Sequence, residues 1–204
     1  MSDQRHDDHG PVRPQVIDLD AEEIRTEPDP QPLRGGRRAP DDVRILVGGT
    51  KQMNLDSVVW DHLVEHAVGA YPNECCGILI RGPAGDVEVA RIRNVQDEMH
   101  AQDPARYPRT ARTAYAGHPA DLKDALERAE RPGFALVGFY HSHPDHAAYF
   151  SDEDLAQATP FGEPSYPDAV QIVVSVYGRE VKDVKAFAWN GERSAYVETA
   201  VRIV

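Results

Sequence analysis

Apolar residues recur at two different spacings from about residue 43 onward, and the spacings separate helices from strands. Between residues 55 and 70 they recur every three or four positions, which predicts an amphipathic helix that ends before Pro72. The same spacing predicts a helix over residues 120–131, and a short helix is expected to start near Ser151. Apolar runs between turn residues predict strands over residues 43–47, 76–81, 87–93, 134–140, 169–176, 181–189 and 195–203.

The order of these elements predicts the fold class. Helices alternate with strands in the first part of the pattern, and strands follow one another at its end. This order is typical of an α/β fold in which helices cover a mixed β-sheet. Residues 94–118 interrupt the pattern with a polar stretch rich in proline, arginine and tyrosine, which we interpret as a loop.

Residues 1–42 differ in composition from the rest of the chain. They contain prolines at positions 11, 14, 28, 30, 32 and 40, many acidic residues and no Phe, Tyr or Trp. Such a stretch cannot bury enough apolar surface to offset the entropy of ordering its chain. We therefore predict a disordered, acidic, proline-rich tail over residues 1–42 and a folded domain over residues 43–204.

Composition excludes several classes of protein. The 204 residues carry a net charge of −12, which argues against a nucleic-acid partner because phosphate binding relies on clustered Lys and Arg. No run approaches the roughly 18 apolar residues of a membrane span, and no apolar segment follows the N-terminal charges, so we expect a cytoplasmic protein without a membrane partner. The two cysteines are adjacent, Cys75 and Cys76, which fits a buried strand and not a disulfide framework.

The segment that carries chemistry is the end of the strand predicted over residues 134–140. Side chains two positions apart share one face of a strand, so His141 and His143 project together, and Pro144 is expected to end the pairing there. A helix that starts at Ser151 would turn Asp154 back toward this strand end. Two imidazoles, one carboxylate and an open fourth position are what catalytic zinc requires.

Three other interpretations use the same residue types. Ser151-x-x-Asp154 is also a helix-capping pattern, but its combination with the histidine pair favours a metal. His141 to His146 also spells the His-x-His-x-Asp-His motif of metallo-β-lactamase-type hydrolases, although no histidine follows His146 to complete that site. Residues 62–66 spell His-x-x-Glu-His, the inverted zincin motif, which we interpret as a helix face with incidental histidines.

The motif His141-x-His143-Pro144, followed by Ser151-x-x-Asp154 with seven residues between His143 and Ser151, closely resembles that of the JAMM/MPN+ (JAB) zinc metalloproteases, in their compact prokaryotic branch. The resemblance covers roughly residues 43–190. One departure is that many members carry a proline immediately before the serine, where this chain has phenylalanine.

The upstream part of the chain resembles the same family. The run of residues 72–79, Pro-Asn-Glu-Cys-Cys-Gly-Ile-Leu, is similar to the strand that bears the catalytic glutamate, which places that role on Glu74. The resemblance implies a three-layer α-β-α fold related to cytidine deaminases. It also implies that His141, His143 and Asp154 bind Zn²⁺ with a water. Glu74 would then transfer the proton of that water to the leaving amine, and Ser151 would stabilise the oxyanion.

Members of this family cut peptide or isopeptide bonds after the C-terminal diglycine of ubiquitin-like proteins, and the compact prokaryotic members act on sulfur-carrier adducts or ubiquitin-like conjugates. The resemblance therefore implies a zinc isopeptidase whose partner is a ubiquitin-like, β-grasp protein ending in Gly-Gly. A homodimer is compatible with the sequence. Two alternatives stay open: a catalytically inactive scaffolding relative, disfavoured because all five polar positions are present, and a non-proteolytic zinc hydrolase.

Overall fold

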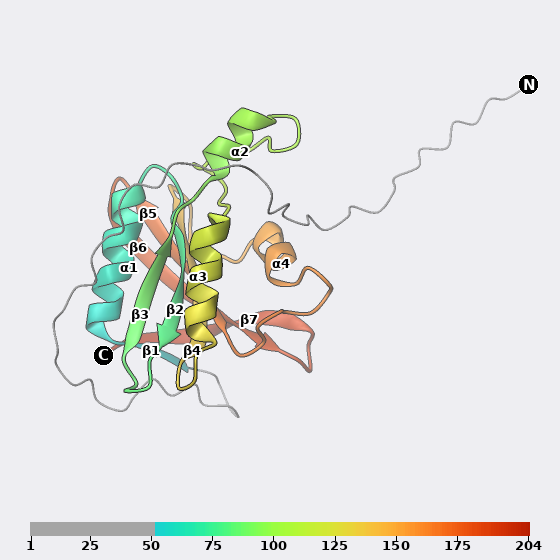
Figure 1. The fold of residues 1–204 in the computed structure, drawn as a ribbon. Helices are drawn as coiled ribbons and strands as arrows, with labels where there is room; N and C mark the ends of the chain where they lie inside the picture. The colour runs from blue at the N-terminus through green and yellow to red at the C-terminus, as the bar shows by residue number, and fades with distance from the viewer. Residues whose placement is uncertain (1–51) are drawn as a thin grey trace, which may run out of the picture. The chain divides into compact units, whose positions relative to one another are not determined.

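The computed structural model describes residues 52–204, so the predicted tail over residues 1–42 and the predicted strand over residues 43–47 lie outside the described residues. Four helices and seven strands make up the described part (Figure 1). The helices are α1 (Ser57–Ala70), α2 (Gln96–Gln102), α3 (Pro119–Ala129) and α4 (Asp152–Ala158). The strands are β1 (Gln52–Leu55), β2 (Cys76–Arg81), β3 (Val87–Ile92), β4 (Ala135–Pro144), β5 (Val170–Tyr177), β6 (Glu180–Asn190) and β7 (Ala195–Ile203).

The strands form one mixed sheet in the order β1-β7-β6-β5-β4-β2-β3. β1 pairs with β7 and β4 pairs with β5 in parallel, whereas the other neighbouring strands are antiparallel. This arrangement confirms the predicted mixed sheet.

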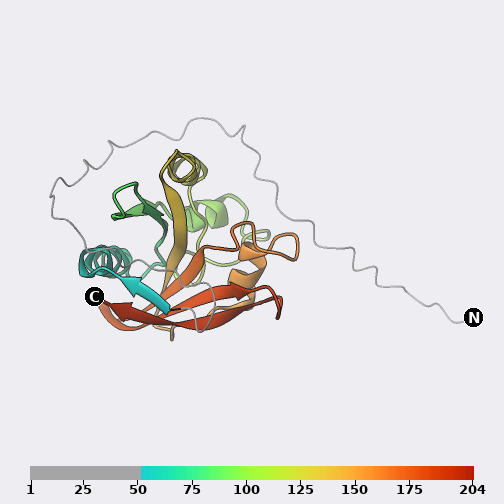
Figure 2. The same ribbon diagram turned by 90° about the horizontal axis from the view of Figure 1, so that it is seen from below.

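Alternate residues of the central strands face two different helices, and this builds the three layers. Leu79 of β2 lies in the core cluster that contains Leu63 of α1. Its neighbour Ile78 lies in a second cluster with Ala125 of α3. Figure 2 shows α1 and α3 well apart, with β2 and β3 between them. The period of two along a buried strand therefore sends successive side chains to opposite helical layers.

The register of β4 sets the position of the histidine pair. β4 lies between β2 and β5, with His141 opposite both Cys76 and Val173. Pairing with β2 stops at this point, but pairing with β5 continues through Pro144. The predicted end of the strand at residue 140 was therefore wrong, whereas the prediction that pairing ends at Pro144 is confirmed. The histidines lie within the last four residues of the strand.

Two elements were not predicted. α2 lies inside the polar stretch that we interpreted as a loop, and only Gln96 of its seven residues is buried. A helix with so little buried surface leaves no apolar periodicity in the sequence. β1 has only four residues and is held by its parallel pairing with β7, far away in the chain. None of the helices within residues 52–204 is long and apolar enough to cross a membrane.

Candidate metal centre

His141, His143 and Asp154 converge at the end of β4, as the sequence predicted. Nε2 of His141 lies 3.1 Å from Nε2 of His143 and 3.3 Å from Oδ1 of Asp154. Nε2 of His143 lies 3.9 Å from Oδ2 of Asp154. All three side chains are buried, and theirs is the one group of potential ligand atoms found close enough together within residues 52–204.

These spacings fit a zinc ion. Zinc–ligand distances of about 2.0–2.1 Å and tetrahedral angles place two ligand atoms about 3.3 Å apart. The separations of 3.1 Å and 3.3 Å around His141 match this value. Two neutral nitrogens and one carboxylate oxygen are also the donor set of catalytic zinc sites, in which the fourth position is open.

The ring nitrogens of His143 are assigned by a backbone contact. Nδ1 lies 3.0 Å from the carbonyl oxygen of Ala147, and because a carbonyl only accepts, Nδ1 carries the proton and donates it. Nε2 is then unprotonated and faces His141 and Asp154. A carbonyl behind a ligating histidine is a usual means of fixing the ring and its tautomer. On the other side, the ring of Tyr115 stacks on His141 with centroids 4.7 Å apart.

The geometry of Asp154 is compatible with both capping and metal binding, which the sequence analysis had treated as alternatives. Its Oδ2 accepts hydrogen bonds from the backbone N–H of Ser151 at 2.8 Å and from the Ser151 hydroxyl at 2.7 Å, which completes a capping box for α4. Its Oδ1 faces His141. Burial alone would raise the pKa of Asp154, but the hydrogen bonds from His141 and Ser151 outweigh it and bring the pKa to about 2. The carboxylate is therefore ionised, as a metal ligand must be.

Ser151 lies at the same site, but its single proton is engaged. The hydroxyl donates to Oδ2 of Asp154 and accepts from the backbone N–H of Asp154 at 3.1 Å. A hydroxyl has one proton to donate, so stabilising an oxyanion requires Ser151 to turn that proton away from Asp154. The predicted oxyanion role of Ser151 stays a prediction, whereas its contact with Asp154 is part of the structure.

Glu74 is buried immediately before β2 and lines a cavity of about 150 Å³ together with His143, Ser151 and Asp154. Burial is the main reason that its pKa is raised to about 8, and the nearby charge of Asp154 raises it further. Arg109, which lines the same cavity, lowers the pKa of Glu74. With this pKa the side chain is mostly protonated at neutral pH, and a cation held by the three neighbouring ligands would favour the carboxylate form that a general base requires.

The residues of the two competing metal motifs make other contacts in the structure. Asp145 of the His-x-His-x-Asp-His run adopts a positive φ of 57° and accepts hydrogen bonds from the hydroxyl of Tyr71. On α1, His66 bonds to the hydroxyl of Tyr140 at 2.8 Å, and Glu65 pairs with Arg91. The prediction that the two cysteines are buried and form no disulfide is confirmed, since Cys75 and Cys76 are buried and free.

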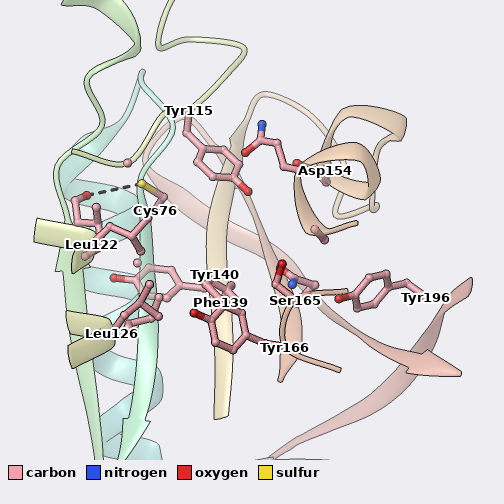
Figure 3. Close-up of a pocket in the computed structure, with 17 residues that line it drawn as sticks. Cys76, Tyr115, Leu122, Leu126, Phe139, Tyr140, Asp154, Ser165, Tyr166 and Tyr196 are labelled. Carbon is pink, nitrogen blue, oxygen red and sulfur yellow. Dashed lines mark hydrogen bonds between the residues drawn. The ribbon is translucent and has the colours of Figure 1, made fainter. Parts of the chain in front are cut away.

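A second, larger cavity of about 250 Å³ adjoins the site (Figure 3). Tyr115, Asp154 and Gln157 line both cavities, so the two lie side by side. The larger cavity is mostly apolar and aromatic; its walls include Ile92, Leu122, Leu126, Phe139, Tyr166 and Tyr196. Among the arginines and tyrosines of residues 103–118, Arg109 and Tyr115 line one or both of these cavities, and Arg106, Tyr107 and Arg112 line neither.

The sequence analysis missed two polar residues whose side chains bind the backbone at and next to Glu74. Ser142, between the two histidines, accepts a hydrogen bond from the backbone N–H of Cys75 at 2.9 Å. Asn94, at the end of β3, donates to the carbonyl of Glu74 at 2.9 Å. The position of Ser142 inside the histidine motif was a signal that we did not use. Nothing local to Asn94 indicates its contact, because the two residues are 20 positions apart.

Comparisons with known proteins show the family of the chain. The family described as prokaryotic homologues of the JAB domain matches residues 56–190. A desampylase from Haloferax volcanii is 32% identical over 146 residues, which cover 72% of this chain and 90% of that protein. A solution structure of a protein from Desulfitobacterium hafniense covers 74% of this chain and 92% of its own, with a TM-score of 0.53 and 21% identity. A JAB1/MPN domain protein from Archaeoglobus fulgidus covers 73% of this chain and 98% of its own, with a TM-score of 0.38 and 19% identity. The chain thus belongs to the family of prokaryotic homologues of the JAB domain.

Proposed function

We propose that this protein is a zinc-dependent isopeptidase that removes a ubiquitin-like protein from its conjugates by cutting after a C-terminal diglycine. The observation that carries the proposal is the buried set of His141, His143 and Asp154 beside Glu74, whose pKa is raised to about 8. The similarity to a desampylase supports the same activity. A sulfur-carrier protein with a bound adduct has the same diglycine end and belongs to the same substrate class.

Three residues would hold the metal, and one would transfer the proton. His141, His143 and Asp154 would hold zinc, which as a Lewis acid makes water a usable nucleophile at neutral pH. Glu74 takes a proton from the water as its oxygen attacks the carbonyl carbon of the terminal glycine. When the carbon–nitrogen bond breaks, Glu74 returns this proton to the leaving amine. The carboxyl is thus regenerated in its starting form, and no other acid is required.

The two neighbouring cavities would hold the substrate chain. Tyr115, Asp154 and Gln157 line both of them. A diglycine has no side chains, so it needs little room at the candidate metal ligands, whereas larger residues on either side of it would lie in the cavities. Two cavities beside one set of ligands favour a peptidase over a hydrolase of small molecules, the alternative that the metal ligands alone leave open.

Cleavage of a diglycine-linked lysine tests the proposal. Zinc-loaded protein should release free lysine derivative from a Gly-Gly isopeptide, and removal of the metal with a chelator should stop the release until zinc is restored. No turnover by zinc-loaded protein on either an isopeptide-linked or a peptide-linked diglycine would contradict it. That result would instead favour the catalytically inactive scaffolding relative.

The role of Ser151 is tested by Ser151→Ala. Loss of an oxyanion donor should lower kcat about 10²–10³-fold at saturating zinc. Because the hydroxyl also contacts Asp154 at 2.7 Å, zinc affinity should fall as well. Zinc titration followed by kinetics at saturating metal separates the two effects. Full recovery of kcat at high zinc would show that Ser151 only orients Asp154.

Arg106→Glu tests the loop of residues 103–118 as a contact for the protein substrate. Arg106 is exposed, lies over the ring of Tyr107 at 5.3 Å and lines neither cavity, so we expect no contact with a short peptide that lies in the cavities. We expect KM to rise about tenfold for a protein substrate, as for an interface hot spot, and to stay unchanged for a short diglycine peptide. Arg109→Glu is the matched comparison and should affect both substrates, because Arg109 lines the cavity of Glu74. Equal KM values for Arg106→Glu and wild type on the protein substrate would remove the loop tip from the interface.

A further inference from the structure

Asn94 makes a hydrogen bond with every donor and acceptor of its side chain. Nδ2 donates to the carbonyl oxygens of Glu74 at 2.9 Å and Ala114 at 3.2 Å. Oδ1 accepts from the backbone N–H of Gln96 and of Ala116, both at 3.0 Å. Since carbonyls only accept and backbone amides only donate, these four partners fix which end of the amide is which.

Asn94 and the loop to which it binds both make hydrogen bonds to the backbone of Glu74. The loop that Asn94 binds returns to the same residue, because the N–H of Glu74 donates to the carbonyl of Ala111 at 2.7 Å. The next residue, Cys75, exchanges hydrogen bonds with Ser142 of β4. Glu74 itself precedes β2 and has no strand partner of its own. Its backbone is therefore held by Asn94 and the loop on one side and by β4 on the other.

We propose that Asn94 is a positioning residue that fixes Glu74 at the metal centre by binding its backbone carbonyl. The inference rests on the proposed function of Glu74 as the acid/base group. A carboxyl that must meet both the attacking water and the leaving amine tolerates little displacement, and an error of about 1 Å can cost about 10²-fold in rate. Only an amide side chain supplies two donors to the carbonyls and one acceptor to the N–H groups at this position.

The test separates the donor end of Asn94 from the acceptor end. Asn94→Asp keeps the acceptor for Gln96 and Ala116 but places an oxygen against the carbonyls of Glu74 and Ala114. Asn94→Ala removes both ends without adding a charge. We expect both variants to bind zinc as wild type does, to keep KM for a diglycine peptide, and to lose up to about 10²-fold in kcat.

A double-mutant cycle shows whether the loss passes through Glu74. In protein that already carries Glu74→Gln, Asn94→Ala should cause little further loss, because the group it positions has gone. Asp103→Ala is the matched control, since its exposed side chain accepts a hydrogen bond from the backbone N–H of Arg106 in the same loop without contacting Glu74. It should leave kcat for a diglycine peptide near the wild-type value. Losses by the same factor for Asn94→Ala in both backgrounds, or an equal loss for Asp103→Ala, would overturn the proposal.

Hydrogen exchange of the metal-free protein tests the contact without any catalysis. Asn94→Ala should speed exchange of the Glu74 amide roughly tenfold, the worth of about one hydrogen bond, and leave the amides of α1 unchanged. Unchanged exchange at Glu74 would overturn the positioning role. If the wild-type protein proved inactive on every diglycine substrate, the proposed function would fall, but the exchange rates would still decide whether Asn94 holds Glu74.

Discussion

Glu74→Gln is expected to retain zinc and to lose about 10²–10⁴-fold in turnover, the usual contribution of a positioned acid/base group. Glutamine has nearly the shape of glutamate, so the buried position is filled and the metal ligands are not disturbed. It has no carboxylate to take the proton of water and no acid to protonate the leaving amine. The loss should therefore appear in kcat, with KM for a diglycine peptide unchanged.

Steady-state kinetics together with elemental analysis check this expectation. Glu65→Gln is a suitable control, because Glu65 is an exposed residue of α1 that pairs with Arg91, and its removal should change neither quantity. Turnover near the wild-type value in Glu74→Gln would show that another group moves the proton. His146, which lines the same cavity as Glu74, would then be the first alternative.

The residues at the metal centre were predictable because local geometry determines how they meet. His141 and His143 are two positions apart on one strand, and this spacing alone places them on one face. Asp154 reaches them because the capping pattern of α4 fixes its orientation relative to Ser151. Capping and metal binding seemed to be competing explanations for Asp154. A carboxylate has two oxygens: Oδ2 completes the capping box, and Oδ1 faces the ring of His141.

The surroundings of Glu74 could not be predicted, because they depend on contacts between distant parts of the chain. Its backbone is fixed by Asn94, by Ala111 and, through Cys75, by Ser142. None of these pairings leaves a periodic pattern, and each exists only once the sheet has formed. The raised pKa of Glu74 has the same origin, since burial by the whole fold is its largest cause.

The elements of the fold likewise divide into those that local sequence patterns predict and those that they do not. Strands β2 to β7 were predicted from apolar runs between turn residues, and helices α1 and α3 from apolar residues spaced three or four apart. Helix α2 buries only Gln96 and was missed. Its contribution is to hold the loop beside the active site, since Gln96 donates to the carbonyl of Arg109 and Asp97 accepts from the N–H of Ala111. Polar contacts of this kind are invisible to an analysis of apolar spacing.

Replacement of both histidines, His141→Ala with His143→Ala, is expected to abolish zinc binding and with it all measurable turnover. About one zinc per chain should be found in the wild-type protein and about none in the double variant, because Asp154 alone offers too few ligands for a zinc site. Since a metal that binds only the folded state stabilises it, the wild type should also melt at a higher temperature with zinc than without. This difference should vanish in the double variant.

His146→Ala is the matched control for the metal, because it removes a histidine that lines the cavity but lies outside the ligand group. It should retain one zinc per chain and the zinc-dependent rise in melting temperature. The comparison decides between the two histidine motifs that overlap in this segment. If zinc content persisted in the double variant but fell in His146→Ala, the ligands would be those of the His-x-His-x-Asp-His pattern, and the assignment of His141, His143 and Asp154 would be wrong. Loss of zinc only when His141 and His143 are replaced would instead place the metal at the end of β4, beside Glu74, where the proposed chemistry requires it.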